Sequence, residues 1–90
     1  MQQYEVQQEQ QSFVLQDDLQ RLRQEIFALR ALASAVGVAA HLREELAVFA
    51  HEVEQLESRA WKRKEVRVLK RNELVRLSLA VLRGYRSPSA

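Results

Sequence analysis

Apolar residues recur along much of the chain at alternating intervals of four and three positions, in two successive runs. The first run extends from Leu15 to Val36, and the second extends from Leu42 to Ala60. This spacing places the apolar side chains on one helix face, where they form the seam through which coiled-coil helices pack. We therefore predict an acidic coiled-coil region over residues 12–60, with an oligomer interface made of Leu15, Leu19, Leu22, Ile26, Leu29, Val36, Leu42, Leu46, Phe49, Val53 and Leu56.

The two seams are out of phase with each other. Val36 and Leu42 lie six positions apart, whereas a continuous seam would require seven, and Gly37 lies within this slip. A tight turn near residues 34–38 would fold the two helices into an antiparallel hairpin. The alternative is one continuous rod that absorbs the slip as a local change of supercoil, since neither Pro nor Asn marks a turn here. We favour the hairpin.

The helical signal begins near Asp17, because Asp17 and Gln20 have the spacing of a capping box. Residues 1–11 are rich in glutamine and poor in apolar side chains, so we expect them to be flexible. Their polar character also leads us to expect no signal peptide in this part of the chain.

Residues 61–84 are basic first and apolar later, and two secondary structures compete for them. Asn72 and Gly84 suit the two ends of a helix. The alternative is a β-hairpin over residues 65–82, where valine and leucine alternate with polar residues. We favour the helix and read residues 85–90 as a tail. On a helix one apolar stripe would anchor a partner protein, and it consists of Leu74, Leu77 and Val81.

The distribution of charge divides the chain into two unlike parts. Residues 1–57 contain four arginines and ten carboxylates, a net charge of −6, whereas residues 58–90 contain ten basic residues and two glutamates, a net charge of +8. If the beginning of residues 58–90 is helical, its cations form a ridge along the helix, and a single tryptophan lies within this ridge. This basic ridge consists of Arg59, Trp61, Lys62, Arg63, Lys64, Arg67, Lys70 and Arg71.

Three kinds of surface suit the basic ridge. The first is the protein's own acidic helix, through residues such as Glu45 and Glu52, and the second is an acidic partner protein. The third is nucleic acid, whose phosphates would pair with the cations while the indole of Trp61 stacks on a base. We expect Trp61 itself to be a packing residue. An amphipathic helix lying on an anionic membrane surface is a weaker alternative.

Residues that could carry chemistry are too sparse to predict an enzyme. Cysteine is absent, and His41 and His51 each have a single carboxylate at helical spacing, which is too few ligands for a metal. The carboxylates that are adjacent in sequence would point about 100° apart on a helix. We expect no catalytic residues, no metal and no cofactor.

These patterns predict an all-α protein, a long helical hairpin or coiled coil with a shorter C-terminal helix, which forms oligomers. The longest apolar stretch, residues 26–42, is interrupted by Arg30 and is too short for a membrane span. We expect a cytoplasmic, non-catalytic adaptor or assembly protein whose partners are itself and a larger protein assembly. The alternative function is that of a small dimeric nucleic-acid-binding factor that uses the segment around Trp61.

Overall fold

The computed structural model describes the backbone of residues 2–86 and the side chains of residues 14–84. This part of the chain contains four helices and no strand: α1 (Gln2–Val36), α2 (Ala40–Glu54), α3 (Ser58–Trp61) and α4 (Lys64–Arg86). The all-α prediction is confirmed, and residues 65–82 form a helix rather than a β-hairpin. The helix α4 continues through residues 85 and 86, and the rest of the predicted tail lies outside the described residues.

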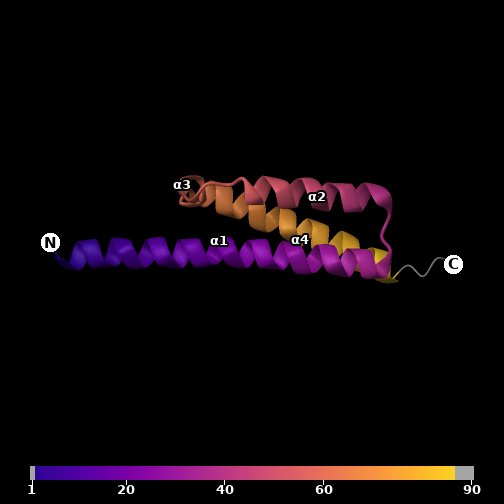
Figure 1. Ribbon diagram of the computed structural model, residues 1–90, viewed down its shortest axis with the longest axis horizontal. Coiled ribbons are helices and arrows are strands. Elements are labelled where there is room, and N and C mark those ends of the chain that lie inside the picture. Colours follow the sequence, from indigo (N-terminus) through magenta and orange to yellow (C-terminus); the bar gives the residue numbers. More distant parts are fainter. Residues whose placement is uncertain (1, 87–90) are drawn as a thin grey trace.

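The three long helices lie side by side along one axis. In Figure 1, α2 runs antiparallel to α1, and α4 returns in the direction of α1 while contacting both. The molecule measures 64 × 19 × 19 Å, and its radius of gyration is 16.3 Å. A compact domain of this length would have a radius of gyration of about 12 Å. The fold is therefore an elongated three-helix bundle, with the beginning of α1 projecting beyond α3 (Figure 1).

The turn between α1 and α2 is built around Gly37, whose φ of 80° lies in the left-handed region. The backbone N–H groups of Gly37 and Val38 both donate to the carbonyl of Ala33, at 3.0 and 3.2 Å. The bond from Val38, with a buried Val38 beside a buried Ala33, is that of the Schellman motif, and the bond from Gly37 is that of the αL motif. Both arrangements commonly end a helix at a left-handed residue. The chain reverses direction here, so the predicted hairpin is confirmed and the continuous rod is wrong.

We expect Gly37→Ala to destabilise the bundle by about 1 kcal/mol, because an alanine side chain disfavours the left-handed conformation. A loss of this size would lower the melting temperature of a domain this small by about 4–8 °C. Gly84→Ala is the matched control, since Gly84 lies within α4 and an added Cβ would meet Val38 Cγ1 at an ordinary 3.4 Å. The control should be neutral or stabilising by about 0.5–1 kcal/mol. Thermal denaturation followed by circular dichroism checks both, and equal shifts would contradict the assignment.

Three predicted helix boundaries are wrong. Asp17 lies well inside α1, and Asn72 and Gly84 lie inside α4. Both Asp17 and Asn72 are exposed, so each keeps its polar side chain in water without having to end the helix. Because α1 already begins at Gln2, it includes most of residues 1–11, whose flexibility stays a prediction.

The core runs along the length of the bundle and draws on every helix. Its buried members in α1 and α2 are the residues of the two predicted seams, which face each other across the hairpin. The bundle is completed by Trp61 from α3 and by Leu77 and Val81 from α4. The buried side chains of the hairpin are Leu19, Leu22, Ile26, Leu29, Ala33, Val38, Leu42, Leu46, Phe49 and Val53.

A side chain from α1 closes the end of α2. The guanidinium of Arg23 donates to the backbone carbonyls of Val53, at 3.4 Å, and Leu56, at 3.2 Å. The last carbonyls of a helix have no partner within the helix, and a cation is favourable at this end. Arg23 therefore fixes the position at which α2 stops and the chain turns toward α3.

Candidate protein-interaction site

The residues predicted to form an oligomer interface lie in the core of a single chain. The α1 seam and the α2 seam cover each other and are covered in turn by α4. Leu15, Val36 and Leu56 are half-buried at the edges of the core, and the other members of the predicted interface are buried. A second chain is therefore not needed to remove these side chains from water, and any self-association has to use another surface.

The predicted partner anchors on α4 are also part of the core. Leu77 and Val81 are fully buried, and Leu74 is half-buried beside them. These residues bind the α1–α2 hairpin of their own chain, so they are not exposed to a partner while the bundle is folded. We call Leu74, Leu77 and Val81 the inner stripe of α4.

A second apolar stripe lies on the opposite face of α4 and has no cover from the described residues. Its members are spaced at intervals of four, three, four and three, with the exposed Asn72 in second place. Val75 is 57% exposed, and the other apolar members are 45–49% exposed. The outer stripe of α4 consists of Val68, Asn72, Val75, Leu79 and Leu82. Large apolar side chains gathered on one exposed helix face mark a surface that binds another molecule.

The sequence contains the helical spacing of the outer stripe as well, although the predicted partner anchors all belong to the inner stripe. Both stripes on α4 have helical spacing, because this helix is apolar around much of its circumference. Spacing alone does not say which face meets the hairpin. The contacts of α4 with α1 and α2 decide that the face with Leu77 is inside and the face with Leu79 is outside.

Part of the basic ridge pairs with the protein's own acidic helices. Arg71 forms ion pairs with Asp18 and, at 3.2 Å, with Glu25 of α1. Lys70 Nζ lies 3.3 Å from a carboxylate oxygen of Glu52 in α2. These pairs are half-exposed and contribute modestly to stability. They orient α4, because its cations meet the carboxylates on one face of the hairpin.

The beginning of the ridge makes different contacts. One guanidinium nitrogen of Arg67 donates to the carbonyls of Trp61 and Lys62, both at 2.8 Å, and so closes the end of α3. Arg63 lies 3.8 Å from Glu65 in an exposed pair. Arg59, Lys62 and Lys64 are exposed and have no carboxylate partner among the described side chains. The structure therefore divides the predicted ridge into a part that holds the bundle together and a part that faces solvent.

Arg76 is a cation of α4 that lies outside the predicted basic ridge. Its guanidinium pairs with Glu73 in the same helix and, at 3.0 Å, with Glu45 of α2. The hydrogen bonds that Arg76 donates to these two carboxylates raise the pKa of Arg76 above its usual range, and the bond to Glu73 lowers the pKa of that carboxyl. A lowered carboxylate pKa means that this pair stabilises the fold at neutral pH and loses its effect in acid.

Trp61 is a packing residue, as predicted, and is 1% exposed. Its indole lies beside Leu15, Leu19 and Ser58, between α1 and α3. The Trp61 Nε1 donor is buried and has no hydrogen-bond acceptor within the part of the chain that the structure describes. In this conformation the ring is not accessible to a nucleobase, so the aromatic element of the predicted nucleic-acid site is missing.

The histidines lie apart from the other candidate groups. His41 and His51 are both exposed on α2. Within the described residues, no three histidine or carboxylate side chains gather closely enough to hold a metal ion. Among the same residues, no helix combines the length and the apolar composition needed to cross a membrane.

No family model matches this chain, and neither a curated protein nor a solved structure gives a significant match. Function has to be inferred from the surfaces of the bundle.

Proposed function

We propose that this chain is a non-catalytic assembly protein that pairs with a second copy of itself through the outer stripe of α4. One observation carries the proposal: α4 is apolar on two opposite faces, and the described residues cover only one of them. The exposed face has the interval pattern of a coiled-coil seam. Burying it against another helix would remove four large apolar side chains from water, which favours association.

A second copy suits the outer stripe better than an unrelated partner because the stripe is complementary to itself. In a parallel, in-register pair each residue meets its own counterpart, and Val75, Leu79 and Leu82 form apolar layers. Asn72 carries both donors and an acceptor, so its side chain can hydrogen-bond to Asn72 of the second copy. A single asparagine in such a seam fixes the register and the number of chains.

The charges beside the outer stripe do not oppose this pairing. Arg71 and Arg76 flank the stripe and would repel the same residues of a second copy if they were unpaired. Each is neutralised within its own chain by two carboxylates, those of Asp18 and Glu25 for Arg71 and those of Glu45 and Glu73 for Arg76. Arg71 and Arg76 therefore bring no uncompensated charge toward a second α4 helix.

The structure lends less support to the nucleic-acid alternative. Lys70 and Arg71 are occupied by carboxylates, Arg67 closes α3, and Trp61 is buried. The cations of the ridge that stay exposed are Arg59, Lys62, Arg63 and Lys64, and phosphate-based affinity falls as fewer charges are left to neutralise phosphates. We therefore place the function of the dimer within a protein assembly.

The test is the mass of the protein in solution, measured by size-exclusion chromatography with light scattering. We expect the wild type to have twice the mass of one chain, and we expect Val75→Glu/Leu79→Glu to weaken dimerisation by at least about tenfold, since it puts carboxylates into an apolar interface. The matched control is Val48→Glu, a change at a valine of α2 that is 53% exposed and lies off the stripe. A monomeric wild type, or equal effects of the two changes, would overturn the proposal.

Cross-linking through an introduced cysteine tests the relative orientation of the two α4 helices. The chain has no cysteine of its own that would compete with the introduced one. In a parallel, in-register dimer of the Val75→Cys variant, the two introduced thiols would lie within disulfide range, so mild oxidation should join the chains. Val48→Cys should stay unlinked at the same protein concentration. Dimers of the wild type without any cross-link through position 75 would show that the helices pair in another register or orientation.

A further inference from the structure

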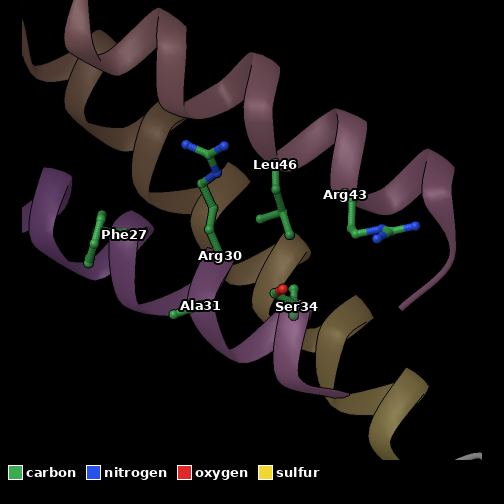
Figure 2. A pocket seen from close by; sticks show the side chains of 7 residues that line it. Phe27, Arg30, Ala31, Ser34, Arg43 and Leu46 are labelled. Carbon is green, nitrogen blue, oxygen red and sulfur yellow. The ribbon is translucent and has the colours of Figure 1, made fainter. Parts of the chain in front are cut away.

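A groove lies between α1 and α2 on the face of the hairpin that α4 does not cover. Figure 2 shows it from the open side, with α4 passing behind the hairpin. Its volume is about 410 Å³, and the side chains that form it include Phe27, Arg30, Ala31, Ser34, Arg43 and Leu46. This groove is separate from the outer stripe of α4, so its use does not depend on the proposed dimer.

The shape of the groove suits a helix. Ala31 and Ser34 are small, which allows a docked helix to approach the backbone of α1 closely. Leu46 points into the groove from α2 and offers an apolar floor (Figure 2). A bundle of three helices whose hairpin is covered on one face leaves room on the other face for the fourth helix of a four-helix bundle.

An exposed aromatic residue stands at the edge of this groove. The side chain of Phe27 is 75% exposed, the largest exposed fraction among the large apolar residues whose side chains the structure describes. A partner that covers this ring would gain about 1.5–3 kcal/mol from its burial. Aromatic side chains beside a groove are common anchors for a bound partner.

The charges of the groove indicate the kind of partner. Arg30 reaches from α1 toward α2, and Arg43 extends from α2 on the other side of Leu46 (Figure 2). Both arginines are exposed, and neither has a carboxylate partner among the described side chains. The groove is therefore apolar in the middle and positively charged at its sides.

The opposite face of the same hairpin shows how such a surface is filled. That face is acidic, and it binds a helix with an apolar stripe flanked by cations, namely α4 with Lys70, Arg71 and Arg76. The groove has the reverse polarity. We infer that it binds an amphipathic helix of a partner protein in which acidic residues flank an apolar stripe, as charge complementarity requires.

The test uses a library of helical peptides as its probe. All peptides share an apolar stripe, and the flanking positions are random mixtures of glutamate and lysine. Peptides are selected on the wild-type protein and counter-selected on Phe27→Ala/Arg43→Glu. The control protein for the selection is Val14→Ala, a change at another exposed residue of α1 that lies outside the groove. We expect the selected peptides to be enriched in glutamate over lysine, and we expect binding to Val14→Ala to be unchanged.

Affinity measurements complete the test. For a selected peptide, Arg30→Glu/Arg43→Glu should weaken binding by about tenfold or more and should improve binding of the matching lysine peptide. No enrichment of glutamate, or no effect of these substitutions, would overturn the inference. A change in the mass of Arg30→Glu/Arg43→Glu by light scattering would also overturn it, since it would assign the groove to a second copy of the chain. The mass of the Val75→Glu/Leu79→Glu variant tests the proposed dimer separately.

Discussion

Leu77→Asp is expected to unfold the bundle. Leu77 is fully buried in the core, where α4 meets the α1–α2 hairpin. Removing a buried leucine side chain costs about 2–5 kcal/mol, and placing an unpaired carboxylate in the same position costs several kcal/mol more. A domain of this size has a total stability of about 5–13 kcal/mol. The substitution should therefore abolish the cooperative thermal transition seen by circular dichroism.

The same change two positions further along α4 is the control. Leu79 belongs to the outer stripe and is half-exposed, so Leu79→Asp places its carboxylate in water. This variant should keep its helical signal and a cooperative transition while dimerising more weakly. If Leu77→Asp melts like the wild type, or if Leu79→Asp unfolds the protein, the inner and outer faces of α4 have been assigned the wrong way round.

The position of the hairpin turn could be predicted because it leaves a mark in the sequence. The two seams are shifted by one position relative to each other, and Gly37 supplies the left-handed residue that the turn needs. Both the interval pattern and the glycine are local properties of the sequence, so the turn can be located without the three-dimensional structure. The helix boundaries at Asp17 and Asn72 were predicted wrongly because a residue that suits a helix end is also tolerated on an exposed helix surface.

The functional surfaces could not be predicted in the same way, because they depend on contacts between residues far apart in sequence. Arg71 pairs with Asp18 across 53 positions, and nothing in the spacing of either residue specifies that pair. The two faces of α4 look alike in sequence, so the docking of α4 on the hairpin decides which leucines remain exposed. The groove at Phe27 likewise exists only because α1 and α2 are packed together.

Trp61→Ala is expected to destabilise the protein by about 3–5 kcal/mol, the usual cost of deleting a large buried aromatic side chain. Trp61 is the largest fully buried side chain and connects the short helix α3 to the hairpin through Leu15 and Leu19. Its loss would leave a cavity at the end of the bundle where α2, α3 and α4 join. Chemical denaturation followed by circular dichroism measures the change as a shift of the unfolding midpoint.

Trp61→Phe separates packing from hydrogen bonding at the same position. The phenyl ring keeps most of the apolar contacts and removes the buried Nε1 donor, which lacks an acceptor among the described residues. An unsatisfied buried donor costs about 1–3 kcal/mol, so its removal should offset much of the lost volume and leave the stability close to that of the wild type. Because Trp61 is the sole tryptophan, the tryptophan fluorescence of the wild type, excited selectively over tyrosine, reports only on this site and should have the blue-shifted emission of a buried indole. A solvent-exposed emission spectrum, together with little effect of Trp61→Ala on stability, would mean that the indole lies outside the core and is accessible to a ligand.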